Sequence, residues 1–333
     1  RPVSSAASDV YKRQVLIIGA GLSGVVAGKR LLNARKTIQL VEKSASIGGR
    51  LANKRFDGAF FDTGAQFFTA RDPIFQNFVS DWVSSGVVKE WYSDYPGALS
   101  VHPRYRGSPA MNIIAKNIAT RLPIKLKTKA LRICHEGEIW KTSFSNDEEI
   151  ISKAILITTP VPQAIEIIDQ SNVVLNKLVK KRLDTISYES CYAIMAILDK
   201  PSKIPAPGSI SIDDDIVSWI SDNQQKGISE IPAITIHSNL DYLEYKNADI
   251  KDLEQSIIES AEKYSKAKVK SYQTHFWRYS KPLEQDAQRF VEANKNTSLP
   301  PLFLAGDAMA GPRVEGAFMS GFCVADAITN NLS

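Results

Sequence analysis

Val15-Leu-Ile-Ile-Gly19-Ala-Gly21-Leu-Ser-Gly24 is the stretch that decides the fold class of this chain. Its apolar, β-branched run over 15–18 stops at a glycine, which is typical of a buried parallel strand. Apolar residues at helical spacing follow over 22–32, and a second strand is predicted over 37–42. A strand, a glycine turn, a helix and a strand form a βαβ unit. The sequence therefore predicts an α/β fold with a Rossmann-type dinucleotide-binding domain.

The three glycines of this stretch have separate tasks in such a domain. Gly19 supplies the tight turn, Gly21 lets the backbone approach a pyrophosphate, and Gly24 allows close contact between helix and strand. The helix that begins at Leu22 directs its N-terminal amides and partial positive charge at the phosphates. Glu42 lies 18 positions after Gly24, at the end of the second strand. Its carboxylate is placed to accept hydrogen bonds from adenosine ribose hydroxyls.

Three further segments favour FAD over NAD. Gly48-Gly49-Arg50 lets the backbone fold over a bound nucleotide, and Arg50 reaches phosphate or flavin oxygens. Leu302-Phe-Leu-Ala-Gly306-Asp307 predicts a strand followed by a carboxylate that accepts from a ribityl hydroxyl. Val314-Glu315-Gly316-Ala317 then begins a helix whose amides face the pyrimidine edge of the flavin. The alternatives are an ordinary surface turn at 48–50 and a helix-capping role for Asp307.

Candidate residues around the flavin ring come from two other stretches. Asp62-Thr-Gly-Ala-Gln66 places small residues against the ring, with Gln66 as a polar contact, unless it is only a packed turn between domains. Trp277 and Tyr279 lie on an aromatic strand that either walls the site or belongs to a core. We predict Gln66, Trp277 and Tyr279 as the catalytic set. Lys281, which lies beside a proline, is more consistent with an exposed side chain than with a catalytic lysine.

The predicted domains are assembled from separated segments. Strands separated by loops after residue 188 indicate a mixed or antiparallel sheet in a second domain inserted into the first. A helix is expected to begin at Ser108-Pro109, with Ser108 as its cap, and to continue to residue 119. Residues 1–13 read as an extraneous leader. The predicted FAD-binding domain comprises 14–72, 107–184 and 299–333, and the substrate domain comprises 73–106 and 185–298.

Composition excludes several classes of protein. The 333 residues include 44% hydrophobic and 23% charged residues with a net charge of +5, and they contain no dense basic block that would indicate nucleic-acid binding. No apolar run approaches the roughly 18 residues that span a bilayer, which predicts no membrane association. Three scattered cysteines indicate a reducing, cytoplasmic compartment and noncovalent cofactor binding, and four histidines lack metal-ligand spacing. These residues are Cys134, Cys191, Cys323, His102, His135, His237 and His275.

From Val15 onward the chain resembles the renalase-like branch of the FAD-dependent amine-oxidase-like flavoproteins. The wider superfamily shares the glycine fingerprint and Gly49-Arg50, whereas Asp62–Gln66, Thr158-Thr-Pro-Val-Pro162 and Trp277-Arg278 are more particular to the branch. The resemblance implies a two-domain fold of the hydroxybenzoate hydroxylase type with noncovalent FAD. Together with the motifs above, the predicted cofactor contacts are Gly19, Gly21, Leu22, Ser23, Gly24, Glu42, Lys43, Gly49, Arg50, Leu51, Gly64, Ala65, Gln66, Ala130, Gly306, Asp307, Glu315, Gly316 and Ala317.

The resemblance also implies an activity. Renalase-like enzymes oxidise misreduced 2- and 6-dihydro isomers of NAD(P), return NAD(P)+ and pass the electrons to oxygen, which gives hydrogen peroxide. The absence of a proton-handling constellation suits this chemistry, because hydride loss restores the nicotinamide's aromaticity without a base, and orientation alone contributes about 7–11 kcal/mol. The alternatives are an amine or amino-acid oxidase on the same scaffold and a flavin-stabilised binding module. Preference for NAD or NADP and the oligomeric state stay open.

Overall fold

The computed structural model describes residues 14–93, 102–171, 173–239, 249–309 and 311–332, so the predicted leader at 1–13 lies outside the described residues. The chain divides into two compact units. The described residues of unit 1 lie within Arg1–Gly49, Ala115–Ser187 and Pro282–Ser333, and those of unit 2 within Arg50–Ile114 and Tyr188–Lys281.

Unit 1 is built on a six-stranded sheet. Its strand order is β17 (Val291–Glu292), β18 (Leu302–Leu304), β11 (Ala154–Ile157), β1 (Val15–Ile18), β2 (Ile38–Val41) and β7 (Ile124–Lys125). The pairs from β18 to β7 are parallel and only β17 is antiparallel, while β1 is buried along its whole length. The predicted Rossmann-type domain is therefore confirmed.

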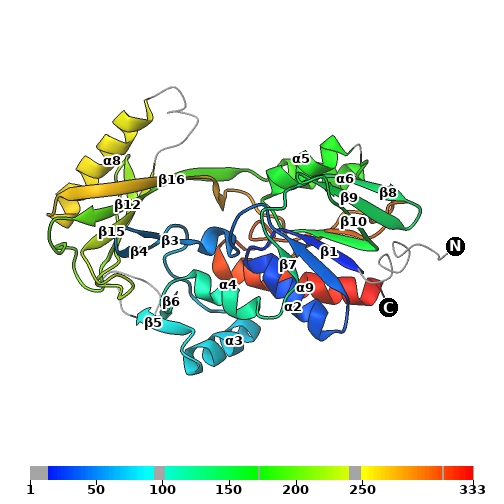
Figure 1. The fold of residues 1–333 in the computed structure, drawn as a ribbon, viewed down its shortest axis with the longest axis horizontal. Coiled ribbons are helices and arrows are strands. Elements are labelled where there is room, and N and C mark those ends of the chain that lie inside the picture. The colour runs from blue at the N-terminus through cyan, green and yellow to red at the C-terminus, as the bar shows by residue number, and fades with distance from the viewer. Residues whose placement is uncertain (1–13, 94–101, 172, 240–248, 310, 333) are drawn as a thin grey trace. The chain divides into compact units, whose positions relative to one another are not determined.

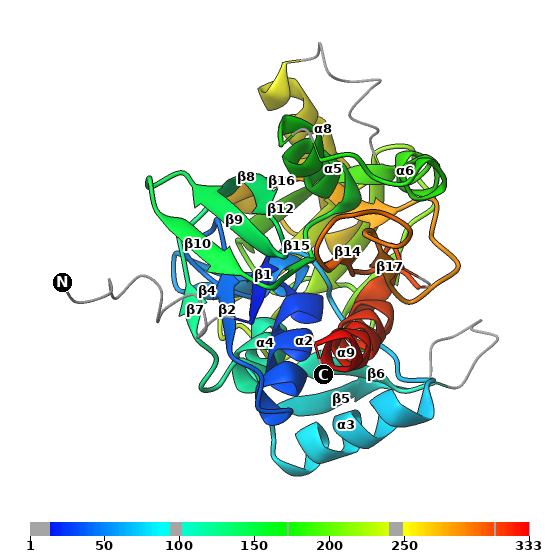
Figure 2. The same cartoon turned by 90° about the vertical axis from the view of Figure 1, so that its right-hand side faces the viewer.

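Two helices and a second sheet cover this sheet. Helices α2 (Leu22–Asn33) and α9 (Arg313–Asn331) lie side by side (Figures 1 and 2). A Cβ on Gly321 of α9 would lie 2.2 Å from the Ser23 carbonyl oxygen of α2, so the two helix backbones touch. The three-stranded sheet β8 (Ala130–Glu136), β9 (Ile139–Phe144) and β10 (Glu149–Ser152) contacts β1 and β11. Helices α5 (Val161–Gln170) and α6 (Lys177–Asp184) follow it.

Unit 2 is built on an antiparallel sheet. Its strand order is β13 (Ser209–Ser211), β14 (Val217–Asp222), β15 (Ala233–Ser238), β12 (Tyr188–Leu198) and β16 (Val269–Pro282). Helix α8 (Ile250–Ser265) packs its apolar stripe, centred on the fully buried Ile257, against β14 and β15. The predicted second sheet of mixed or antiparallel type is present, and the α/β class with a Rossmann-type domain and a second sheet holds.

Two hairpins and two helices complete unit 2. The hairpins are β3 (Asn53–Phe56) with β4 (Ala59–Asp62) and β5 (Val88–Tyr92) with β6 (Arg104–Gly107), and the helices are α3 (Pro73–Ser84) and α4 (Asn112–Ile118), whose last residues fall in unit 1. Strand β4 packs against β15, so residues 50–72 group with unit 2, although the predicted division placed them with the FAD-binding domain.

Helix α4 begins four residues after the predicted cap. The prediction that Ser108 caps a helix starting at Pro109 is wrong, because α4 starts at Asn112 and the Ser108 N–H donates to the Val87 carbonyl. The Met111 N–H, just before the helix, donates to the Asp62 carboxylate at 2.8 Å. A carboxylate distant in sequence therefore takes the place of the expected local cap.

Candidate functional site

The glycine turn after β1 is closed by backbone contacts that only glycine allows. Gly19 has φ of +107°, in the region that side chains rarely adopt, and Gly19 N–H donates to the Val41 carbonyl at 2.9 Å. A Cβ on Gly24 would lie 2.0 Å from the Gly19 oxygen. The Thr158 hydroxyl donates to the same oxygen at 2.9 Å and fixes the turn to the end of β11. These contacts explain the glycine at two of the three fingerprint positions.

The third glycine faces open space at the start of α2. A Cβ on Gly21 would meet no atom within 4 Å, so its role is not packing within the protein. Gly21 is the N-cap of α2 without a side-chain cap, and the first turn contains no acidic residue. The Ser23 hydroxyl in that turn is buried without a hydrogen-bond partner. Uncapped amides, an orphaned hydroxyl and a vacant approach at a glycine fit a bound pyrophosphate.

Glu42 is held at the end of β2 by the backbone around it. Its carboxylate accepts from the Ala20 N–H and the Ser44 N–H, each at 2.9 Å. A carboxylate has about four lone-pair sites, so this arrangement leaves capacity for ribose hydroxyls. The Thr128 N–H donates to the Glu42 carbonyl at 2.8 Å, which brings the buried Ala130 of β8 to the same place. Lys43 is exposed beside it.

The second glycine turn lies against the first. The Gly48 N–H donates to the Ala20 carbonyl at 2.8 Å, and Gly48 forms a bridge with Gly21. Gly49 has φ of +53°, and a Cβ there would lie 3.3 Å from the Gly21 Cα. Two of the motifs singled out in the sequence therefore meet in unit 1. Leu51, the last predicted contact of this stretch, is buried.

The C-terminal segment forms a third glycine turn in unit 1. The Gly306 N–H donates to the Ser320 hydroxyl of α9 at 2.8 Å, and Asp307 is buried. A Cβ on Gly316 would lie 1.6 Å from the Gly311 oxygen, so the turn before α9 packs tightly onto its first residues. Helix α9 has Pro312 as N-cap without a side-chain cap, and Glu315 lies in its first turn. Ala317, one position beyond Gly316, is partly exposed.

In unit 2 the segment Asp62–Gln66 folds against Arg50. The Ala65 N–H donates to the Arg50 carbonyl at 2.9 Å, and a Cβ on Gly64 would lie 2.1 Å from that same oxygen. The Thr63 N–H donates to the Ala52 carbonyl at 3.0 Å. Arg50, Gly64 and Ala65, which the sequence predicts as cofactor contacts, therefore come together within one unit.

Gln66 is buried, and both ends of its amide group are engaged within unit 2. Its Nε2 donates to the Asp62 carbonyl at 2.6 Å and to the Gly64 carbonyl at 3.0 Å. Its Oε1 accepts from the Ser221 hydroxyl at 2.7 Å and from Lys226 Nζ at 3.3 Å. The role of Gln66 as a catalytic contact stays a prediction. In this structure its amide group hydrogen-bonds to other groups of unit 2, two of them carbonyls of its own segment.

Lys226 is the residue that sequence reasoning missed. Its Nζ lies 2.7 Å from Asp62 Oδ2, and both side chains are 0% exposed. Burial lowers the pKa of Lys226 from its usual value, the Asp62 carboxylate opposes that shift, and Arg106 adds to it. The ring of Trp91 lies 5.0 Å from the same nitrogen. The sequence carried one signal, a polar run ending in Lys226 directly after the apolar strand at 216–220.

The ring nitrogens of Trp277 and His237 both bind the Thr63 carbonyl. Trp277 Nε1 donates to the Thr63 oxygen at 2.9 Å, and His237 Nε2 lies 3.2 Å from it. Desolvation lowers the pKa of His237 to about 4, and the charge of Lys226 acts in the same direction. His237 is therefore neutral at pH 7 and donates from Nε2 to the carbonyl. His275, which packs edge-on against Trp277, is exposed.

The remaining predicted residues of β16 lie near Arg50. Tyr279 packs edge-on against Tyr188, with ring centres 5.6 Å apart, and the Arg50 guanidinium lies 5.9 Å from the Tyr188 ring. Arg50 Nη1 also donates to the Ser280 carbonyl at 3.2 Å. Lys281 pairs with Glu189 at 3.2 Å with its side chain 55% exposed, as the sequence indicated.

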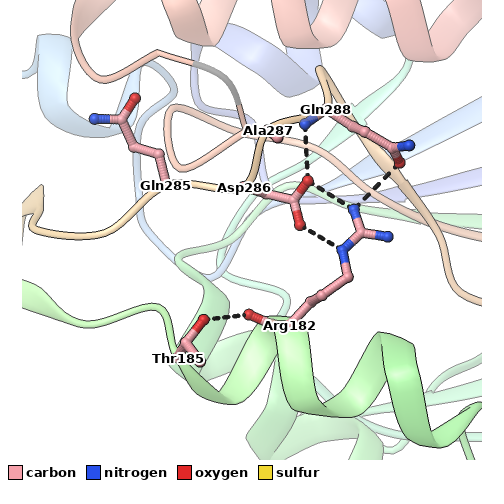
Figure 3. A pocket seen from close by; sticks show the side chains of 6 residues that line it. All are labelled: Arg182, Thr185, Gln285, Asp286, Ala287 and Gln288. Carbon is pink, nitrogen blue, oxygen red and sulfur yellow. Dashed lines mark hydrogen bonds and ion pairs between the residues drawn. The ribbon is translucent and has the colours of Figure 1, made fainter.

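Unit 1 contains a pocket that no predicted site residue lines. The pocket has a volume of about 300 Å³, and Figure 3 shows its lining by Arg182, Thr185, Gln285, Asp286, Ala287 and Gln288. Arg182 binds both Asp286 oxygens, at 2.6 and 2.9 Å, and its Nη2 also donates to Gln288. The Asp286 N–H donates to the Ala308 carbonyl at 2.8 Å, which ties this loop to the residue after Asp307.

Two other kinds of feature, a metal site and a membrane-spanning helix, are absent from the described residues. Among the described residues, no group of three or more His, Cys, Asp or Glu side chains is arranged to hold a metal ion. Within the same residues no helix combines the length and apolar character that a membrane crossing requires.

Comparison with known proteins agrees with this geometry. Residues 17–82 match the NAD(P)-binding Rossmann-like domain, and residues 90–329 match the family described as flavin containing amine oxidoreductase. Renalase from Mus musculus is 23% identical over 336 residues, which cover 93% of this chain and 97% of renalase.

Two solved structures share the fold. Putrescine oxidase bound to putrescine superimposes with a TM-score of 0.72 at 13% identity, over 95% of this chain and 98% of its own. Cyclohexylamine oxidase from Brevibacterium oxydans IH-35A gives a TM-score of 0.69 at 14% identity, over 96% and 99%. With most of its length matched by one family, the chain belongs to the flavin containing amine oxidoreductases and is a renalase-like, FAD-dependent oxidoreductase.

Proposed function

We propose that this chain is an FAD-dependent oxidase that takes hydride from misreduced 2- or 6-dihydro isomers of NAD(P). Bound FAD would accept the hydride and be reoxidised by oxygen, giving NAD(P)+ and hydrogen peroxide. The observation that carries the proposal is similarity to renalase over nearly the whole of both chains, joined to the uncapped, glycine-lined start of α2.

Unit 1 is suited to hold the ADP half of FAD. Amides at the start of α2 and the Ser23 hydroxyl would bind the pyrophosphate, and Glu42 would accept from the adenosine ribose. Asp307 would accept from the ribityl chain. The other predicted contacts, among them Arg50 and Gly64–Gln66, stay proposals.

The polar groups of the Asp62–Gln66 segment support hydride transfer over a reaction that needs a base. Lys226 is paired with Asp62, Gln66 uses its amide on the segment, and His237 binds the Thr63 carbonyl. Trp277 uses its N–H on the same carbonyl, so it offers a ligand only its ring. The chain's own contribution would then be orientation of two rings rather than removal of a proton.

Anaerobic stopped-flow of the holoenzyme against separated dihydronicotinamide isomers and candidate amines tests the proposal. We expect rapid bleaching of the flavin band by a 2- or 6-dihydro isomer and none by amines. Bleaching by an amine with no response to the isomers would instead support the alternative, an amine or amino-acid oxidase. If no reductant bleaches a stoichiometrically bound flavin, the chain is a flavin-stabilised binding module.

We also propose that the FAD is noncovalent. The three cysteines lie on β8, β12 and α9, none of them is a predicted cofactor contact, and Cys191 is buried. Acid precipitation of the holoenzyme should release all yellow colour into the supernatant, whereas colour retained in the pellet would contradict noncovalent binding.

A further inference from the structure

Lys226 is a fully buried cation, and the net contribution of its ion pair to folding stability is too small to account for a lysine at this position. Both members of the Lys226–Asp62 pair are 0% exposed, and removing two charges from water generally costs about as much as their attraction returns. We propose that Lys226 is a positioning residue that fixes the backbone of Asp62–Gln66 in the conformation it presents to the flavin. The inference rests on the proposed role of that segment in binding FAD.

Lys226 reaches both ends of the segment. Its Nζ binds Asp62 Oδ2 at 2.7 Å and Gln66 Oε1 at 3.3 Å, so one ammonium group connects the first residue to the last. The other Asp62 oxygen accepts from the Met111 N–H at 2.8 Å. The pair thereby holds the end of β4 against the start of α4 as well.

The bond to Lys226 also decides which way the Gln66 amide faces. Lys226 and the Ser221 hydroxyl are donors, so they fix Oε1 on their side. Nε2 is then directed at the Asp62 and Gly64 carbonyls. A Gln66 amide turned by half a rotation would set a donor against the Lys226 ammonium and an acceptor against two carbonyls. Lys226 therefore favours a single orientation of the Gln66 amide.

All three carbonyls of Asp62, Thr63 and Gly64 accept side-chain hydrogen bonds within unit 2. Asp62 O also accepts from the Thr235 hydroxyl at 3.2 Å, and Thr63 O is bound by His237 and Trp277. Gly64 and Ala65 are partly exposed, while the residues on either side of them are buried. The carbonyl edge of the segment is therefore fixed, and Gly64–Ala65 is the part left accessible to a ligand.

Hydrogen bonds within the surrounding turn fix the position of Lys226. It lies on the turn after β14, where the Asp222 carboxylate accepts from the Gln224 and Gln225 N–H groups, each at 2.9 Å. The Lys226 N–H donates to the Asp222 carbonyl at 2.9 Å, and Asn223 Nδ2 donates to the Thr235 hydroxyl at 3.0 Å. A turn with this many internal bonds presents the ammonium at a defined place.

Hydrogen exchange of the full-length protein tests the inference without relying on activity. The Thr63 and Ala65 amides, which donate to Ala52 and Arg50 carbonyls, report on the segment. In Lys226→Met we expect their exchange to become about tenfold faster or more. The segment loses its bonds to the Lys226 ammonium, so it should open locally more often. The matched control is Ile257→Ala, which shortens a fully buried side chain of α8 in unit 2. It should accelerate exchange around α8 and leave the segment unchanged.

The double variant Asp62→Asn/Lys226→Met keeps the test decisive if the single variant fails to fold. It leaves no charge at either position of the pair, and the amide oxygen introduced at position 62 can still accept from the Met111 N–H. Faster exchange at Thr63 and Ala65 in either variant supports positioning. Wild-type exchange there in the folded variant, or equal acceleration in Ile257→Ala, overturns it.

A second measurement uses the flavin. With whichever reductant bleaches the wild-type holoenzyme, Lys226→Met or the folded double variant should lower the reduction rate constant at saturation about tenfold, with a smaller change in the half-saturating concentration. Ile257→Ala should keep the wild-type rate constant. Failure of the isomers to reduce wild-type flavin would contradict the proposed function alone, because the exchange result stands without it.

Discussion

Two ion pairs, one in each unit, each hold a segment that the sequence predicts to bind FAD. In unit 2 Lys226 and Asp62 are both fully buried and fix the start of Asp62–Gln66. In unit 1 the Arg182 side chain is 39% exposed, its partner Asp286 is 4% exposed, and the Asp286 backbone binds Ala308. Water can replace the partner of Arg182 but not that of Lys226. The same type of contact should therefore differ several-fold in its importance for stability.

The largest effect should follow from breaking the buried pair. Lys226→Met leaves Asp62 as an uncompensated buried carboxyl, which typically costs about 3–5 kcal/mol of unfolding free energy. Urea denaturation followed by tryptophan fluorescence, which Trp91 and Trp277 report, measures the loss. Asp62→Asn/Lys226→Met should recover at least half of it, because neither charge remains. A loss below about 1 kcal/mol in the single variant would show that the pair behaves like a surface pair.

The next effect compares a glycine from each region. Gly64→Ala should lower the unfolding free energy by about 1–3 kcal/mol, because its Cβ would lie 2.1 Å from the Arg50 oxygen. Gly21→Ala meets no protein atom within 4 Å, so the apoprotein should unfold at the wild-type temperature. We expect FAD affinity in Gly21→Ala to fall tenfold or more, measured by flavin fluorescence on release. Unchanged affinity would exclude the turn at Gly21 as the pyrophosphate site.

The contrast between these glycines also shows what the sequence could predict. The fingerprint at 19–24 and the acidic residue at 42 lie within one βαβ unit, where local spacing fixes their geometry, and the structure brings Gly21 to Gly48 as well. The Lys226–Asp62 pair joins residues 164 positions apart, and nothing in local spacing encodes such a meeting. The Asp62 carboxylate also accepts from the Met111 N–H just before α4, where the sequence predicted Ser108 as a cap. Local spacing does not encode this contact either.

Gln66 shows a second limit. The sequence identified it as a polar residue beside the ring, but its four partners come from the segment itself, β14 and the following turn. Residue type alone does not tell which side of a loop an amide faces. The polar run at 222–226 after a buried strand was the available signal, since buried polar residues need partners.

A smaller effect should appear in the pH dependence of unit 2. Desolvation lowers the pKa of His237 to about 4, below its usual 6.5, so the unfolded chain binds a proton that the folded chain does not. Stability contributed by neutral His237 is complete above pH 6.5 and is lost as the pH falls toward 4. The side chain is only partly buried, so we expect about 1–2 kcal/mol of loss by pH 4.5. His237→Gln should flatten this part of the curve in urea titrations at successive pH values, and an unchanged slope would assign it to other groups.

The smallest effect should come from the Arg182–Asp286 pair, in which the arginine is partly exposed. Arg182→Met removes two bonds to Asp286, but that carboxylate also accepts from the Gln288 N–H at 2.8 Å, and solvent reaches the pocket between them. We expect an unfolding free energy within about 1 kcal/mol of wild type, and less difference at high salt. Any local effect should be confined to exchange of the Asp286 amide, which donates to Ala308 and so reports on the segment after Asp307. If Arg182→Met instead destabilises the protein as much as Lys226→Met, solvent exposure does not decide the strength of these pairs, and the contrast drawn between the two units fails.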